Sequence, residues 1–546
     1  MSNDSTTPSN DGTLMGVMIL TRHGDREGFY QDPLTYTASL TSITPLGTVQ
    51  EFQLGQQLRG KYLNSHSPLF IPGIAADLFD QTQIHVRADA GGELGVIYDS
   101  AVALLQGLFP ATPSFTTTLA NGTTVEGALG GYQYVPIESV EPANDVSLEG
   151  YTNCATFDAA TLAFYNSPEF LQKANDSAHF LSLLPPFLDG RPVTLVNIYN
   201  IFDYVNVNFI HNATFANSLP PTFLQQVRDL ANFHEHGVFT SAQLNGIGNI
   251  AGRTILPVMI QELQAIANAS NPLKIAYQSL AYKPFLSLFN MTGAAQQNPR
   301  LANMVNYAAA VVLEVRQPAG GGDAVLRLKF KNGTDEADFT TYNFLGQTHD
   351  VPLTDLINFV TPALIPSTSA WCAACNNTQD RGCAALTKAA ATGQVSRRDG
   401  LVERQGLAER STVFADESVG YQHQAMISPV NAGLVGMSAT LAMLGMLMLL
   451  GFISVGKGRH SRKDYSSLRN IRRGSIFVKI VEILITFTNY AVVSSILVRL
   501  SSDMDHSIPT AVLQCLGYSN ELFCGIMGFQ YLVRVFCMVF YSALGA

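Results

Sequence analysis

Three side chains able to bind and attack a phosphoryl group stand close together in the segment TRHGDREGFY, residues 21–30 of the 546-residue chain. Arg22, His23 and Arg26 lie within five consecutive positions, one residue after the apolar run LMGVMIL. Guanidinium groups bind phosphate oxygens through paired hydrogen bonds and stabilise transition-state charge. An imidazole nitrogen can attack phosphorus when a hydrogen bond holds the ring's other nitrogen. The motif therefore predicts a phosphate site, with a solvated charged turn as the alternative.

The elements around this motif predict where it lies. Residues 14–20 form a short apolar run typical of a buried strand, so the motif would follow its carboxyl end. Thr44 and Pro45 are expected to be the N-cap and first position of a helix over residues 46–63. This order of strand, loop and helix is the first unit of an α/β pattern.

The same unit recurs twice. Residues 83–90 alternate like a strand that ends near Arg87, and residues 93–109 read as a helix stopped by Pro110. Residues 273–280 and 284–291 repeat the pair of strand and helix. Such units predict a mainly parallel sheet covered by helices, with ligands beyond the carboxyl ends of the strands.

Two further segments complete the predicted fold, a three-layer α/β sandwich. Residues from about 115 to 240 form a long insertion rich in Phe, Leu and Pro, which we interpret as a helical cap beside the site. Residues 308–330 read as two strands joined by a glycine-rich turn, a hairpin that finishes the sheet.

The motif resembles the signature of the histidine acid phosphatases, branch 2 of the histidine phosphatase superfamily, in which RHG is followed by an Arg two residues later. The similarity covers roughly residues 14–385 and includes TPLGTVQEFQLGQQLRGKY, SAVALLQGLFP and KFKNG in the family's order. Within this family, the sequence is similar to phytases and fungal acid phosphatases. The resemblance implies a phosphohistidine at His23, with Arg22, Arg26 and Arg87 binding the phosphate and no cofactor.

One departure from this family bears on activity. After the third strand the family places a His-Asp pair, whose Asp protonates the leaving group, but here the matching positions are Ala281 and Tyr282. A phenol with a pKa near 10 is a weak acid, and Lys283 could replace only a positive charge. The chain's one literal His-Asp, His349–Asp350, follows the hairpin. Two hypotheses therefore stay open: an active phosphatase, and a pseudophosphatase that binds a phosphorylated ligand or a protein.

Cysteines and sequons indicate a secretory setting for the first 430 residues. This part carries eight Asn-X-Ser/Thr sequons and four cysteines, Cys154, Cys372, Cys375 and Cys383. An even count favours disulfides, with the pairing open, over redox chemistry at WCAAC. His234 and His236 are separated by one residue and do not share a helix face, so we expect no metal.

The remaining segments predict a membrane anchor. Residues 431–455 contain no charge over 25 positions, enough to cross a bilayer, and residues 457–473 carry seven Lys or Arg and one Asp. The positive-inside rule puts this basic flank in the cytosol and residues 1–430 outside. The full expected order begins with a disordered N-terminus without a signal peptide (1–13) and a phosphatase-like domain (14–385). A flexible stalk (386–430) and a transmembrane helix (431–455) follow. The chain ends in a basic cytoplasmic segment with an apolar tail (456–546).

The apolar tail admits two interpretations. After residue 474 it could add one or two membrane segments, or it could be a wrongly predicted gene end without a fold. A net charge of -10, from 32 Lys and Arg against 42 Asp and Glu, excludes the basic face that nucleic-acid binding needs. The expected partners are a phosphorylated small molecule and the membrane.

Overall fold

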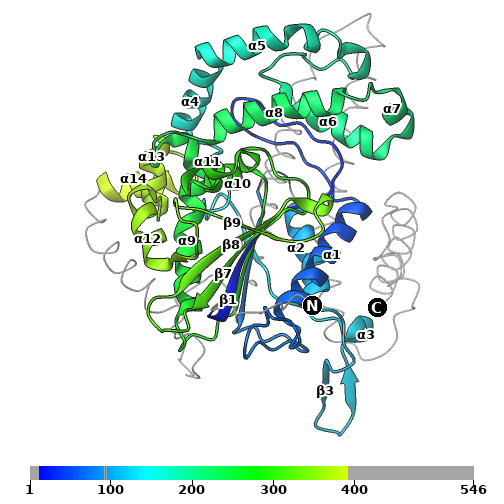
Figure 1. Cartoon of the computed structure of the whole chain (residues 1–546), viewed down its shortest axis with the longest axis vertical. Coiled ribbons are helices and arrows are strands. Elements are labelled where there is room, and N and C mark those ends of the chain that lie inside the picture. The colour runs from blue at the N-terminus through cyan, green and yellow to red at the C-terminus, as the bar shows by residue number, and fades with distance from the viewer. Residues whose placement is uncertain (1–11, 92, 94, 392–546) are drawn as a thin grey trace, which may run out of the picture. The chain divides into compact units, whose positions relative to one another are not determined.

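A mixed β-sheet forms the centre of the computed structural model, which describes residues 12–91, 93 and 95–391 (Figure 1). Its order is β10-β8-β7-β1-β6-β2-β5, and β9 pairs with β8. The strands are β1 (Thr13–Arg22), β2 (Ile84–Asp89), β5 (Glu138–Val140), β6 (Ile275–Leu280), β7 (Ala310–Gln317), β8 (Val325–Lys331), β9 (Thr340–Tyr342) and β10 (Val351–Pro352). Strands β1, β6, β2 and β5 are parallel, whereas β7 to β10 are antiparallel to their neighbours. The three predicted units and the predicted hairpin are confirmed.

Helices cover both faces of the sheet. Helices α1 (Pro45–Tyr62) and α2 (Val96–Leu108) share a core with Val17 and Ile19 of β1. Met18 and Leu20 point to the opposite face, into the core that contains α9 (Ile250–Ala267) and α10 (Lys283–Met291). This alternation follows from the two-residue period of a strand, and it produces the three predicted layers.

A group of helices lies together at one end of the sheet (Figure 1). It forms the helical part of the predicted cap, whereas the first part of the insertion carries the small β3–β4 hairpin (Thr116–Thr118 and Thr124–Glu126), a one-turn helix α3 (Ala128–Gly131) and strand β5. The cap helices are α4 (Ala155–Tyr165), α5 (Pro168–Leu181), α6 (Ile198–His211), α7 (Ala213–Ser218) and α8 (Phe223–Phe239).

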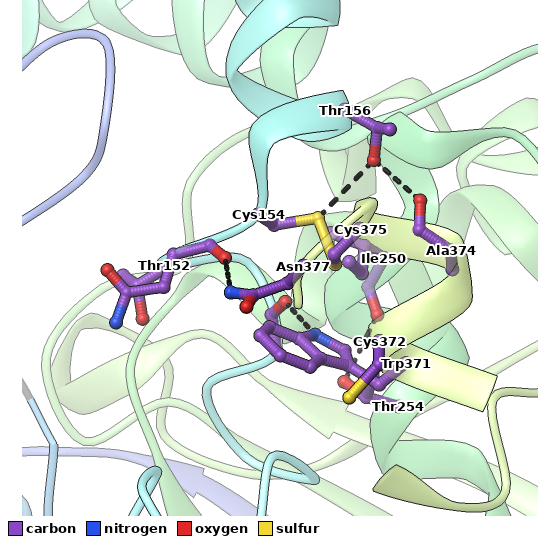
Figure 2. The surroundings of a disulfide bond; sticks show 12 residues. Thr152, Cys154, Thr156, Ile250, Thr254, Trp371, Cys372, Ala374, Cys375 and Asn377 are labelled. Atoms are coloured by element: carbon purple, nitrogen blue, oxygen red, sulfur yellow. Dashed lines mark hydrogen bonds between the residues drawn. A yellow bond between two sulfur atoms is a disulfide. The ribbon is translucent and has the colours of Figure 1, made fainter. Parts of the chain in front are cut away.

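One disulfide joins the insertion to the last part of the described chain, and a second lies within that last part. Cys154, which precedes α4, pairs with Cys375 of α13 (Thr368–Cys375), and Cys372 pairs with Cys383 at the start of α14 (Cys383–Ala391). Beside them, the indole of Trp371 donates a 2.7 Å hydrogen bond to the carbonyl of Gly150 (Figure 2). The predicted structural cystines are confirmed. The two cysteines of WCAAC bond to different partners, so the motif is not a dithiol pair.

The described residues contain no helix that is both long and apolar enough to cross a membrane. The segments predicted as transmembrane helix, basic flank and apolar tail lie outside the described residues, as do most of the predicted stalk and the first eleven residues.

Candidate active site

The RHG motif leaves the sheet at the carboxyl end of β1. The backbone N–H of His23 donates to the carbonyl of Leu280 at 3.1 Å, and its carbonyl accepts from Ala308 at 3.1 Å. These two bonds hold His23 between the end of β6 and the segment that enters β7. The position beyond a central parallel strand is the one that the sequence predicted for a ligand site.

Two glycines allow helix α1 to pack directly on the motif. A Cβ on Gly24 would lie 2.5 Å from the carbonyl oxygen of Gly47, and a Cβ on Gly47 would lie 2.1 Å from that of Asp25. The predicted N-cap is also confirmed, because Thr44 Oγ1 accepts from the Gly47 N–H at 3.1 Å. The same hydroxyl donates to Asp25 Oδ2, so the helix start and the motif loop are fixed together.

The imidazole of His23 is completely buried and oriented from both sides. Its Nδ1 lies 2.8 Å from the Gly24 carbonyl, which requires a proton on Nδ1 and directs Nε2 to the other side. Nε2 lies 3.1 Å from Oε2 of Glu93. Burial lowers the pKa of His23, Glu93 opposes this shift, and Arg22 and Arg26 add to it.

Arg26 is also fully buried and is shared between two carboxylates. Its Nε lies 3.1 Å from Oε2 of Glu93, and its Nη2 lies 2.9 Å from Oδ1 of Asp203 on cap helix α6. The guanidinium stands 3.9 Å from the ring centre of Phe29. Burial disfavours the charge, but Asp203 and Glu93 outweigh it and raise the pKa of Arg26 above its usual range.

Arg22 has fewer partners than Arg26. Its Nη1 donates to the carbonyl of Val305 at 2.5 Å, and its guanidinium stands 4.5 Å from the ring centre of Tyr307 and 5.3 Å from that of Tyr282. Its Nε is buried and has no hydrogen-bond partner in the part of the chain that the structure describes. This N–H is therefore available to a ligand oxygen.

Glu93 is the site residue that sequence reasoning missed. Besides His23 and Arg26, it approaches Nζ of the buried Lys283 at 3.9 Å. Burial disfavours its ionisation, but His23, Arg26 and Lys283 hold the pKa of Glu93 well below its usual range. The available signal was its place in AGGELGV, directly beyond the second strand. We predicted a helix from residue 93, but α2 begins at Val96, and Glu93 lies in the preceding turn.

The structure brings Arg22, His23 and Arg26 together but holds Arg87 in another group. Arg87 Nε lies 2.9 Å from Glu138 Oε2, and its Nη2 donates to Asp145 and Ser147. In the sheet Arg87 is level with Gln278 and Leu20, three residues before His23. At a rise of about 3.3 Å per residue, that is about 10 Å below the motif.

The residues in place of the family's His-Asp pair offer no free acid group. Ala281 is buried and carries no polar group. The Tyr282 phenol donates to Oε2 of Glu235 at 2.7 Å and stacks on Tyr199. Burial and Glu235 raise the pKa of Tyr282 well above its usual value. Its proton is therefore held by Glu235.

Two other pairs considered as sites serve different contacts. His234 Nδ1 lies 2.8 Å from Glu235 Oε1, and residues 12–91, 93 and 95–391 contain no group of three or more side chains arranged to bind a metal. Asp350 pairs with Arg327 of β8 through two 2.8 Å contacts. In the sheet Arg327 pairs with Glu314, and Glu314 pairs with Val17 of β1, which is six residues before His23. His349 and Asp350 therefore cannot supply the missing pair at the motif.

Comparison with protein families gives a match over more than half of the chain. A family model described as "Histidine phosphatase superfamily (branch 2)" matches residues 27–331, beginning four residues after His23. Human lysosomal acid phosphatase is 22% identical over 370 residues, 65% of this chain and 79% of that protein. Bovine prostatic acid phosphatase is 22% identical over 277 residues, 49% of this chain and 65% of that protein. The phytase of Klebsiella sp. ASR1 is 14% identical in a structural match with a TM-score of 0.46, covering 65% of this chain and 96% of that one.

Proposed function

Because the chain belongs to branch 2 of the histidine phosphatase superfamily, we propose that it is a histidine acid phosphatase that hydrolyses phosphomonoesters through a phosphohistidine at His23. Nε2 of His23 attacks phosphorus and forms the P–N bond, and the ester P–O bond breaks as the leaving oxygen takes its electron pair and a proton from water. Water then cleaves the P–N bond, which releases inorganic phosphate and restores the imidazole. Arg22 and Arg26 bind the phosphoryl oxygens.

One observation carries this proposal. A single oxygen, Oε2 of Glu93, lies 3.1 Å from Nε2 of His23 and 3.1 Å from Nε of Arg26. One ligand oxygen can therefore touch both the nucleophile and a cation. The proposal rests on Arg22 and Arg26, because Nε and Nη2 of Arg87 are bonded to Glu138, Asp145 and Ser147, whereas its Nη1 is buried without a hydrogen-bond partner among the described residues.

We further propose that the phosphatase domain is glycosylated and lies outside the cytosol, anchored by residues 431–455. The two disulfides and the relatives named lysosomal acid phosphatases support such a compartment. The uncharged 25-residue run and the basic residues after it support a membrane-spanning helix.

The second candidate is a pseudophosphatase that binds a phosphorylated small molecule or a protein without turnover. It is favoured by the replacement of the family's His-Asp pair with Ala281 and Tyr282, whose phenol donates to Glu235. Loss of a general acid costs a factor of about 10²–10⁴ in rate, mostly for poor leaving groups. Aryl phosphates need this proton least.

The test compares two substrates on the full-length chain, produced in a secretory host and purified in detergent. We expect release of phosphate from an aryl phosphate, much slower release from an alkyl phosphate, and an acid-quenched phosphoprotein that is absent from His23→Ala. Aryl hydrolysis no faster than in His23→Ala would refute the enzyme, whereas efficient alkyl hydrolysis would refute the pseudophosphatase.

A further inference from the structure

The carboxylate of Glu93 lies where a ligand of His23 would have to lie. We propose that Glu93 occupies the phosphoryl subsite as an internal anion, and that it competes with phosphorylated ligands and sets their affinity. The inference rests on the proposed function, because the subsite is defined by His23 and Arg26.

The contacts of Glu93 are those expected of a bound oxyanion. Oε2 lies between Nε2 of His23 and Nε of Arg26, at 3.1 Å from each, and Oε1 is 3.9 Å from Nζ of Lys283. Guanidinium groups bind carboxylate and phosphate oxygens with the same hydrogen-bond geometry. A buried carboxylate can therefore stand in for a phosphoryl group at these cations.

Glu93 and a phosphorylated ligand cannot occupy the phosphoryl subsite at the same time. Nε2 of His23 is buried, and attack on phosphorus requires the reacting atoms to approach to about 3–3.5 Å. Oε2 of Glu93 already lies at that distance. A phosphate beside an unmoved Glu93 would also place two anions in contact within a buried site.

The surrounding charges show what the ligand must displace. The cations near Glu93 are Arg26, Lys283 and His23 when protonated. Arg26 is already paired with Asp203, and Lys283 also lies in the field of three other carboxylates, which belong to Asp89, Glu149 and Glu235. Inorganic phosphate gains few contacts beyond those that Glu93 gives up. A ligand with further groups to bind is therefore favoured over free phosphate.

The test is the binding of inorganic phosphate to the full-length chain by isothermal titration calorimetry. Glu93→Gln keeps the size of the side chain and removes its charge, and we expect it to bind phosphate roughly ten- to a hundredfold more tightly than the wild type. Glu51→Gln is the matched control, because Glu51 is fully buried on α1 and neither carboxylate oxygen has a hydrogen-bond partner among the described residues. Its phosphate affinity should equal that of the wild type.

A second variant guards against misfolding of Glu93→Gln. Glu93→Asp keeps the charge but is one methylene shorter, so it should bind phosphate several-fold more tightly. Phosphate should also raise the melting temperature of both variants more than that of the wild type. Equal affinity in the wild type and whichever Glu93 variants fold would overturn the inference, as would an absence of phosphate binding in all of them.

Hydrolysis of an aryl phosphate separates this inference from the proposed function. His23-dependent turnover, together with unchanged phosphate affinity in the Glu93 variants, would support the proposed phosphatase activity and refute the role of Glu93 as an internal anion. Tighter phosphate binding in the variants with no turnover in any protein would leave the inference and support the pseudophosphatase.

Discussion

Replacement of Tyr282 by Phe tests whether this residue supplies the missing acid. Its phenol is fully buried and donates to Oε2 of Glu235 at 2.7 Å, and its pKa is raised by burial and by Glu235. A proton held in this way is a poor source for a leaving group. We therefore expect kcat on both aryl and alkyl phosphates to change by less than about threefold, which is about 0.6 kcal/mol in the activation barrier.

Tyr282→Phe should instead lower the free energy of unfolding. Tyr282→Phe removes one donor from Glu235, which keeps Tyr36 at 3.2 Å and His234 at 2.8 Å on its other oxygen. A lost hydrogen bond to a buried charged group costs about 1–3 kcal/mol. A lost general acid would instead raise the barrier by about 2.7–5.5 kcal/mol, a factor of about 10²–10⁴ in rate.

Tyr36→Phe is the matched control, because it removes a phenol from the same carboxylate on a buried side chain that does not contact His23 in the described structure. Urea unfolding should give similar losses for the two variants, and their steady-state kinetics should match the wild type. A loss of a hundredfold or more in kcat on the alkyl phosphate in Tyr282→Phe, but not in Tyr36→Phe, would show instead that Tyr282 supplies the proton.

Three further outcomes are expected. Gly47→Ala should abolish most of kcat/KM, because its Cβ would lie 2.1 Å from the carbonyl of Asp25, whereas Gly60→Ala on the same helix has open space and should be neutral or stabilising in thermal melts. Loss of the Cys154–Cys375 link, which spans 221 residues, should cost about 5 kcal/mol in urea unfolding, against about 3 kcal/mol for the 11-residue link of Cys372. Glu138 and Glu262 raise the pKa of His85 to about 9, so the protonated form of His85 stabilises the fold. The wild type should therefore have a higher free energy of unfolding than His85→Gln. This difference should be complete below pH about 6.5 and lost as pH rises through about 9.

Much of the fold could be predicted because each element carries its own signal. The apolar run before the motif became β1, and the Thr44–Pro45 start of α1 was visible as an N-cap followed by proline. Local pattern could not give the order of strands, since β1 lies between β6 and β7, which follow it by more than 250 residues. It could not give the disulfide pairing either.

The site was predicted less completely, because the sequence does not show how the strands align with one another in the sheet. The sequence predicts that Arg87 lies where the second strand ends. Only the alignment of β2 with β6 and β1 shows that Arg87 is level with Leu20, three residues before His23. The residue that does reach His23 is Glu93, which lies in the turn beyond the strand. An acidic residue in such a turn does not suggest a phosphate site until its contacts with cations are known.

The two arginines of the motif are therefore unequal probes of phosphate binding. Arg26 is paired with both Glu93 and Asp203, and its removal would leave two buried carboxylates without their cation. Breaking such buried pairs costs about 3–5 kcal/mol, so a loss of activity in an Arg26 variant would report on folding as much as on the pocket. Arg22 bonds to one backbone carbonyl and has a buried Nε without a partner among the described residues. Changes in phosphate affinity at Arg22 consequently reflect ligand contacts more directly.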